Sequence, residues 1–368
     1  MTDIEKSAKK ALFGHSTDFL SHTLENARQE VEPRTTLLKD GSKAILHALG
    51  ILEFIPATNN NSIKPTKLIL SAGIHGNETA PIEFCNTLIN EVLEDQYPIK
   101  VPTLFILGNP QAMVEGKRFI EHNLNRLFCG LHKSESYCNS IEGKRAALIE
   151  QYVDLFVNQG GKHSQDEYPV NHYDLHTAIR DSVFERFAIY PYVAGRETNP
   201  VQLQFLAFSD IEAFLFQTTP ATTFSSHTAE NYDAESFTVE LGKVRPFGHN
   251  IDYKYRAITE NLRLRLQGSW PQPRRPEHRV QCFIATHEII NTGKDFQLFI
   301  PEDVSNFREY PKGSLIWQDK EQSYRVKDQV EYIVFPNSKV GVGQRAGIML
   351  RLVDMGQTPG QPSTPVLH

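Results

Sequence analysis

Leu68-Ile69-Leu70-Ser71-Ala72-Gly73-Ile74-His75-Gly76-Asn77-Glu78 is the stretch of sequence that decides the fold. Its apolar start predicts a buried strand over Lys67 to Ala72, and the two glycines allow a tight turn where that strand ends. Apolar residues then recur at helical spacing and predict a helix from about Glu78 to Asp95. In this setting His75 and Glu78 suit two ligands of one zinc ion, and a catalytic zinc site uses three protein ligands with the fourth position left to water. The stretch favours a zinc-dependent hydrolase. The alternative is that His75 is an ordinary turn histidine and Glu78 an ordinary residue of the first helical turn.

Strand and helix patterns alternate along the rest of the first 270 residues or so. Two further helices are predicted, one from about Ser140 to the stop signal Gly160-Gly161 and one over Asn250 to Leu266. Short apolar runs predict the remaining strands at Leu104–Leu107, Tyr173–His176, Phe187–Tyr190, Ala213–Phe216 and Phe237–Leu241. This alternation predicts an α/β domain whose sheet is largely parallel and is flanked by helices.

The run Gly268-Ser269-Trp270-Pro271-Gln272-Pro273-Arg274-Arg275-Pro276 breaks all regular structure and marks a domain boundary. After it come short runs of alternating hydrophobicity, which predict a smaller all-β domain. We therefore divide the chain into an N-terminal extension (1–40), an α/β domain (41–268), a β-rich C-terminal domain (277–355) and a tail (356–368). The tail is rich in proline, glycine, serine and threonine and is predicted to be disordered.

Composition excludes several classes of protein. The 368 residues are 40% hydrophobic and 10% aromatic, enough for a sizeable core and for two domains. A formal net charge of -6 offers no basic surface for nucleic acid or for an anionic membrane. No apolar run approaches the ~18 residues of a membrane span, and the first residues lack the apolar core of a signal peptide, so we expect a cytoplasmic protein. The 4 cysteines include no C-x-x-C pair, which argues against disulfides and against a thiolate zinc site.

The best third metal ligand is His176, at the end of the strand predicted in Tyr173-Asp174-Leu175-His176-Thr177. Ligands of open α/β sheets bind beyond the carboxyl ends of the strands, so His75 and His176 can converge there. Asp174 lies on the same face of the strand and is expected to support the site or to be a buried structural carboxylate. His172 is the competitor, but four residues of extended chain separate it from His176 by about 13 Å, too far for one ion. We therefore assign His172 a surface or structural role.

Glu240 is the candidate general acid/base. It lies in Phe237-Thr238-Val239-Glu240-Leu241, where a carboxylate between apolar residues of a buried strand is costly unless it has a partner or a task. A glutamate beside a metal can take a proton from the attacking water and later deliver it to a leaving amine. A structural ion pair with a nearby lysine or arginine, such as Lys243, is the alternative.

Substrate-binding groups are sought in the segment Gly116-Lys117-Arg118-Phe119-Ile120-Glu121-His122-Asn123-Leu124-Asn125-Arg126. An arginine presents a planar fork of donors that matches a carboxylate, and another can stabilise an oxyanion on a scissile carbonyl. Surface arginines near turns are common and usually only solvated, so the segment by itself is weak support.

Four motifs together resemble one known family. His75-x-x-Glu78, Asn125-Arg126, Asp174-Leu175-His176-Thr177 and Glu240-Leu241-Gly242, in this order, are similar to the zinc carboxypeptidase-like family in its aspartoacylase and succinylglutamate desuccinylase branch. The similarity spans roughly residues 40 to 250. Several segments, including Thr177-Ala178-Ile179-Arg180-Asp181-Ser182 and Leu241-Gly242-Lys243-Val244-Arg245-Pro246, resemble the desuccinylase side of that branch in particular.

The resemblance implies a zinc carboxypeptidase-like fold and one Zn²⁺ per chain, bound by His75, Glu78 and His176. It implies Glu240 as general acid/base and Arg118 as the group that polarises the scissile carbonyl, with Asn125 and Arg126 binding a substrate carboxylate. The implied reaction is hydrolysis of the linear amide of a small molecule, N-succinyl-L-glutamate, to succinate and L-glutamate. That reaction is the last step of the arginine succinyltransferase pathway of arginine catabolism.

One position departs from the aspartoacylase pattern. Where that relative carries an arginine after Ala-Thr-Thr, this chain has Ala221-Thr222-Thr223-Phe224, and phenylalanine cannot bind a carboxylate. The departure argues against N-acetylaspartate and leaves the partner of a second substrate carboxylate open among Arg180, Lys243 and Arg245. The alternatives for the whole chain are a related N-acyl-amino-acid deacylase or carboxypeptidase and a non-catalytic zinc protein.

Overall fold

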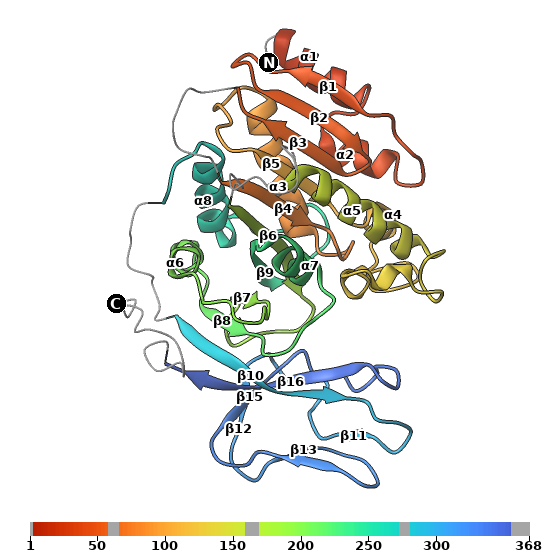
Figure 1. Ribbon diagram of the computed structural model, residues 1–368, viewed down its shortest axis with the longest axis vertical. Coiled ribbons are helices and arrows are strands. Elements are labelled where there is room, and N and C mark those ends of the chain that lie inside the picture. The colour runs from red at the N-terminus through yellow and green to blue at the C-terminus, as the bar shows by residue number, and fades with distance from the viewer. Residues whose placement is uncertain (1–2, 58–65, 159–168, 272–279, 355–368) are drawn as a thin grey trace. The chain divides into compact units, whose positions relative to one another are not determined.

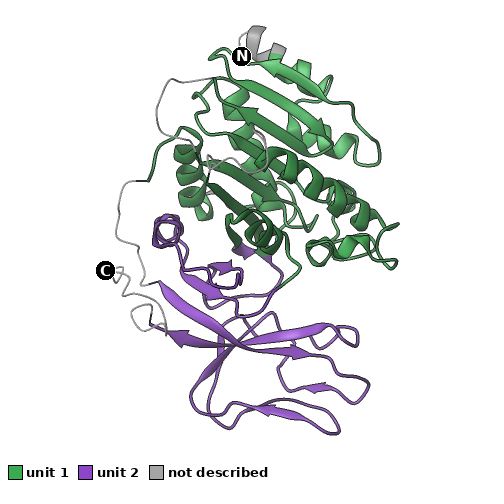
Figure 2. Cartoon of the chain, viewed as in Figure 1, with its two compact units in different colours: residues 1–177, 221–239, 244–274 green, residues 178–220, 240–243, 275–368 purple. Residues whose placement is uncertain are grey.

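The computed structural model describes residues 3–57, 66–158, 169–271 and 280–354 (Figure 1). Contacts divide the chain into two units (Figure 2): unit 1 comprises residues 1–177, 221–239 and 244–274, and unit 2 comprises residues 178–220, 240–243 and 275–368. The predicted helix stop at Gly160-Gly161, part of the predicted break at 268–276 and the whole of the predicted tail (356–368) lie outside the described residues. The division of the chain at residues 268–277 stays a prediction.

Unit 1 contains a mixed sheet with the strand order β1-β2-β3-β5-β4-β6-β9. The central strands β4, β5 and β6 run parallel to one another, whereas β1, β2 and β3 pair antiparallel at one edge and β3 pairs antiparallel with β5. The strands are β1 (Arg34–Leu37), β2 (Lys43–Ala48), β3 (Ile51–Ile55), β4 (Lys67–Ala72), β5 (Thr103–Leu107), β6 (Val170–Ala178) and β9 (Glu235–Lys243). The last residue of β6 and residues 240–243 of β9 belong to unit 2.

The burial of the strands explains their sequences. Every residue of β4 and β5 is buried, which requires the continuous apolar runs from which both strands were predicted. All nine residues of β6 are buried as well, although the strand carries Asn171, His172, Asp174 and His176. Polar side chains in a buried central strand are costly unless each has a partner, so β6 is where the fold itself points to a functional site.

Helices flank this sheet, as the sequence predicted. They are α1 (Asp3–Phe13), α2 (Phe19–Glu25), α3 (Thr79–Leu93), α4 (Pro110–Val114), α5 (Ile141–Val157), α7 (Phe224–Tyr232) and α8 (Arg256–Leu266), with single 3-10 turns at η1 (Leu124–Arg126), η2 (Leu131–Lys133) and η3 (Asp252–Lys254). Ile149 and Val153 of α5 pack into one buried cluster with Ile69, Leu104 and Ile106 of the sheet. Helix α3 contacts β4 and also α1, α2 and α8.

Unit 2 combines two strands from the middle of the chain with the C-terminal strands. Its main sheet has the order β7-β8-β10-β16-β15-β12, and a second sheet has the order β11-β13-β14. The elements are β7 (Arg186–Tyr190), α6 (Pro200–Phe208), β8 (Ala213–Phe216), β10 (Gln281–Ile290), β11 (Gln297–Leu298), β12 (Arg308–Tyr310), β13 (Leu315–Gln318), β14 (Ser323–Arg325), β15 (Glu331–Val334) and β16 (Arg345–Val353). The mixed α/β class with a β-rich C-terminal part is therefore confirmed. Among the described residues, no helix is long and apolar enough to cross a membrane.

Candidate metal centre

The turn between β4 and α3 has a backbone that favours glycine at two positions. Gly73 has a φ of +67°, in the left-handed region. A Cβ atom at Gly76 would overlap the backbone of Ala112 and Met113 at the end of α4. The turn therefore packs directly against α4, and this fixes His75 and the start of α3 at the carboxyl end of β4.

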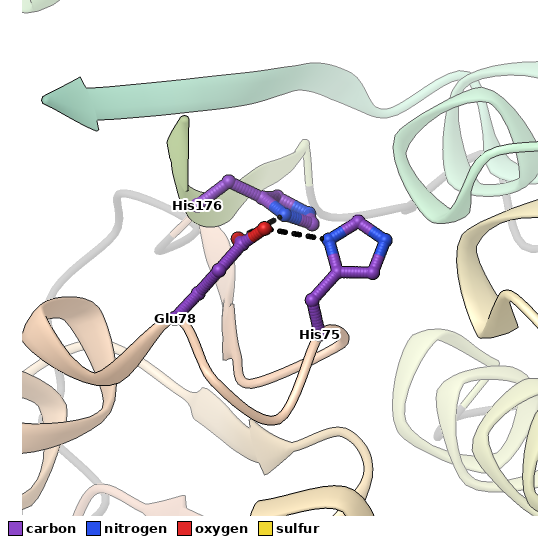
Figure 3. Close-up of side chains that lie close together, drawn as sticks. All are labelled: His75, Glu78 and His176. Carbon is purple, nitrogen blue, oxygen red and sulfur yellow. Dashed lines mark hydrogen bonds and ion pairs between the residues drawn. The ribbon is translucent and has the colours of Figure 1, made fainter. Parts of the chain in front are cut away.

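His75, Glu78 and His176 converge at this edge of the sheet (Figure 3). One ligand atom from each lies within 4.8 Å of the other two, and all three side chains are buried. His75 comes from the turn, Glu78 from the residue before α3, and His176 from β6. Two imidazoles and a carboxylate are the donor set of open zinc sites. The three residues predicted as ligands can therefore hold one metal ion.

Hydrogen bonds orient the two imidazole rings. The Nδ1 atoms of His75 and His176 each lie 2.8 Å from an oxygen of Glu78. Their Nε2 atoms face other acceptors, 3.0 Å from Asn123 Oδ1 for His75 and 3.0 Å from Asp174 Oδ2 for His176. An acceptor at Nε2 keeps a proton there and leaves Nδ1 as the atom for a metal. Asp174 has the supporting position expected for it.

The electrostatics of the cluster suit a cation. Burial and the nearby Arg118 guanidinium lower the pKa of His75 to about 4, so this ring is neutral and able to ligate. Burial acts in the same direction on His176, but the carboxylates of Asp174 and Glu78 outweigh it and keep the pKa of that ring well above its ordinary value. The pKa of Glu78 stays well below its ordinary value because both histidines offset the effect of burial. A metal ion held by His176 would take the place of a proton on this ring.

Arg118 lies against the same carboxylate. Its Nη1 donates to Glu78 Oε1 at 2.7 Å, and about a third of its side chain is exposed. Its carbonyl accepts the N–H of Gly76 at 3.1 Å, which ties its backbone to the turn that carries His75. Arg118, which was predicted to act on the substrate, is therefore in direct contact with the ligand Glu78.

His172 is not a ligand but part of a buried polar chain behind the ligands. Its Nε2 lies 2.8 Å from Ser71 Oγ, and Ser71 donates to Asp174 Oδ1 at 2.6 Å. On the other side, His172 Nδ1 lies 2.8 Å from Thr228 Oγ1 of α7. Burial lowers the pKa of His172 to about 4, so the ring is neutral. The structural alternative for His172 is confirmed, the surface alternative is wrong, and the sequence analysis did not single out Ser71 or Thr228.

We expect His172→Ala to keep the metal and to destabilise the fold. The change removes a fully buried ring and its two hydrogen bonds, which should cost ~3 kcal/mol of the free energy of unfolding. Chemical denaturation and metal analysis of the same preparation check this. Loss of the metal at a normal unfolding free energy would contradict the role assigned to His172.

The remaining predicted site residues have different environments. Asn125 is buried, and its Oδ1 accepts the N–H of Phe224 at 2.9 Å, at the start of α7. Arg126 is exposed, and its Nη1 donates to the carbonyl of Asn125 at 2.8 Å. Glu240 is a buried residue of β9, in the part of that strand that belongs to unit 2. The roles of these three residues stay predictions.

Family models match most of the chain. Residues 64–266 match the model described as the succinylglutamate desuccinylase/aspartoacylase catalytic domain, and residues 278–353 match the AstE/AspA barrel-sandwich hybrid domain. A succinylglutamate desuccinylase of Shewanella piezotolerans is 39% identical over 342 residues, which cover 92% of this chain and 96% of the relative. One from Idiomarina loihiensis is 39% identical over 332 residues, covering 90% and 94%.

A solved structure has the same fold. The crystal structure of a protein from Vibrio parahaemolyticus described as a succinylglutamate desuccinylase superposes with a TM-score of 0.82 at 32% identity. The superposition covers 95% of this chain and 98% of that one. The similarity thus extends over both domain matches and includes the segments that carry the ligand cluster.

Proposed function

Because the chain belongs to the succinylglutamate desuccinylase/aspartoacylase family, we propose that it hydrolyses the amide bond of N-succinyl-L-glutamate to succinate and L-glutamate. The observation that carries the proposal is the buried cluster of His75, Glu78 and His176 inside a chain that is 39% identical to a succinylglutamate desuccinylase over 92% of its length. Phe224 supports the choice within the family. It is buried at the start of α7 and offers no charge to the carboxylate of N-acetylaspartate.

Zinc is the metal we propose for the cluster. The donor set of two imidazoles and one carboxylate leaves a fourth position open, as catalytic zinc sites do. When bound there, zinc supplies Lewis acidity, which acidifies water and polarises a carbonyl oxygen. Asp174 and Asn123 orient the two histidine rings for this ion through their Nε2 atoms.

Glu240 and Arg118 perform the proton transfer and the charge stabilisation in this proposal. The Glu240 carboxylate takes a proton from the attacking water and gives it to the glutamate nitrogen as the amide bond breaks. The guanidinium of Arg118 donates to the oxygen of the scissile carbonyl as negative charge develops on it. Its contact with Glu78 supports this role, because that contact orients the guanidinium beside the ligands.

Charged groups on the substrate need cationic partners. Arg126 is exposed next to buried Asn125, which supports the proposal that the pair binds one carboxylate.

For a second carboxylate we favour Arg245 over Arg180 and Lys243. The carbonyl of Arg245 accepts from Thr79 Oγ1 at 2.7 Å, and Thr79 directly follows the ligand Glu78. Lys243 already donates to Asp181 at 2.8 Å.

Arg126→Lys should raise KM by about tenfold while kcat changes little, because lysine keeps the charge but loses the planar fork that binds a carboxylate with two bonds. Steady-state kinetics with N-succinyl-L-glutamate measure both constants. Arg28→Lys is the matched control, since Arg28 is an exposed arginine paired with Glu115. A KM within twofold of wild type would remove Arg126 from the substrate site.

The test of the function itself is a hydrolysis assay on three substrates. Purified protein is given N-succinyl-L-glutamate, N-acetyl-L-aspartate and a short peptide, before and after removal of metal with a chelator. We expect rapid release of succinate from the first substrate and recovery of that activity when zinc is returned. Faster hydrolysis of the acetyl substrate or of the peptide would favour the related deacylase or carboxypeptidase, and zinc binding without hydrolysis would favour a structural metal site.

A further inference from the structure

The segment 117–123, here called the arginine loop, carries two groups of the site but has no regular secondary structure. Arg118 contacts Glu78, and Asn123 contacts the Nε2 atom of His75. Backbone N–H groups of an irregular segment need partners from elsewhere in the fold. Three consecutive N–H groups of this loop, those of residues 120–122, find their partner in one side chain.

That side chain is Glu142, in the first turn of α5 and fully buried. Its Oε2 accepts the N–H groups of Glu121 at 3.1 Å and His122 at 3.0 Å, and its Oε1 accepts the N–H of Ile120 at 2.7 Å. Oε1 also accepts from Asn109 Nδ2 at 3.0 Å. Three consecutive backbone donors and one amide therefore surround one carboxylate, and charge-assisted bonds of this kind are about twice as strong as neutral ones.

Further hydrogen bonds connect the arginine loop to the start of α5 and connect Asn109 to the turn that carries His75. The Glu121 carboxylate accepts the N–H of Ile141, the first residue of α5, at 2.7 Å. Asn109 donates its backbone N–H to the carbonyl of Gly73 at 2.8 Å, and Gly73 begins the turn that carries His75. The start of α5, the arginine loop and the turn after β4 thus form one hydrogen-bonded assembly with Glu142 near its centre.

We propose that Glu142 is a positioning residue for the hydrolysis, because its carboxylate fixes the arginine loop and so orients Arg118 toward the reacting carbonyl. The proposal rests on the function proposed above and extends it to a residue of α5. Small errors in the placement of catalytic groups are expensive, since a displacement of about 1 Å can cost about 100-fold in rate.

Glu142→Gln is the informative change, because it keeps the shape and supplies one acceptor oxygen in place of two. An amide at this position accepts from one pair of donors and turns its own N–H₂ toward the other pair. We expect kcat to fall about 10- to 100-fold with a smaller change in KM and with zinc retained. Glu121→Gln is the control, since that exposed side chain accepts a single N–H and its amide oxygen can do the same.

A double-mutant cycle separates positioning from mere stability. If Glu142 acts through Arg118, adding Glu142→Gln to Arg118→Ala should lower kcat by no more than about twofold, because the two residues act as one unit. Multiplicative losses of kcat in the double variant would overturn the proposal. All assays are run well below the Tm of each variant.

Hydrogen exchange keeps this test independent of the substrate. In the zinc-loaded protein, the backbone amides of residues 120–122 should exchange faster in the Glu142→Gln variant than in wild type. In the Glu121→Gln variant, the exchange rates of these amides should equal those of wild type. Unaltered exchange at these amides would show that Glu142 does not anchor the loop. If the wild-type protein releases no succinate, the proposed function is contradicted. The hydrogen-exchange result is independent of that outcome, because it tests only whether Glu142 anchors the loop.

Discussion

His176→Ala should strip the protein of its metal and lower kcat/KM by about 10³- to 10⁵-fold, since metal-ion catalysis supplies several kcal/mol of transition-state stabilisation. The change removes one of three ligands and also leaves two buried carboxylates, Glu78 and Asp174, without the ring that now lies between them. Repulsion between these carboxylates weakens what remains of the site. Metal content after dialysis and initial rates with N-succinyl-L-glutamate are the measurements.

The matched control for this variant is His172→Ala, four residues earlier on the same strand and equally buried. It removes the same ring from the same face of β6 but should keep the metal. If His176→Ala bound zinc at full occupancy, the ligand assignment would be wrong, whatever its activity. If both variants lost zinc equally, metal loss would reflect damage to β6 rather than loss of a ligand.

Glu240→Gln should keep the zinc and the fold but lose at least about 100-fold in kcat, roughly 3 kcal/mol of transition-state stabilisation. The amide preserves the size and shape of the buried side chain while removing its capacity to take and give a proton. Measuring kcat, zinc content and Tm on one preparation distinguishes this outcome from structural damage. The expected pattern is a large loss of kcat with a small change in Tm.

A purely structural Glu240 would behave in the opposite way. In Glu240→Gln, loss of the ion pair would lower the Tm first. Activity would then fall only as the fold loosened. Retention of more than about a tenth of kcat in Glu240→Gln would rule out the acid/base role, because such groups contribute about 10²- to 10⁴-fold. Asp174→Asn would then be the next variant to assay, since Asp174 is the carboxylate bonded to His176.

The sequence was most informative where local pattern and chemistry coincide. His75 and Glu78 follow an apolar strand and a glycine turn, and His176 lies near the carboxyl end of a second strand, so both the elements and their convergence could be predicted. The β-rich C-terminal part was predicted for a similar reason, because alternating runs are a local signal. Ligands and strands of this kind can be predicted without knowing which distant parts of the chain contact them.

Other features depend on tertiary contacts and were missed. The strands β1 to β3 were not predicted. Strand β1 is largely exposed and lacks a clear alternation of apolar residues. Strand β3, in contrast, is a short, almost fully buried and mostly apolar run that could have been predicted. Helix α6 was missed as well, although Asn199 followed by Pro200 is a signal for a helix start that could have been used. Helix α7 begins at Phe224, in a stretch that we examined only for its substrate contacts.

Two other supporting residues, Glu142 and Ser71, were not predicted from the sequence, unlike Asp174. Glu142 follows a serine that caps α5, so it has the appearance of an ordinary first-turn acid. Only the folded chain brings the arginine loop around its carboxylate. In the sequence, Ser71 is similarly one polar residue in an apolar strand. Its partners Asp174 and His172 come from the neighbouring strand β6, so they are found only in the folded chain.

The close approach of Gly76 to the end of α4 has a consequence for variants at this position. Alanine is the smallest replacement available, and even its single methyl group would overlap the backbone of Ala112 and Met113. Any substitution at this position must therefore displace the backbone of the turn or of α4. We expect a variant of this protein with alanine at position 76 to lose activity although its three ligands are intact.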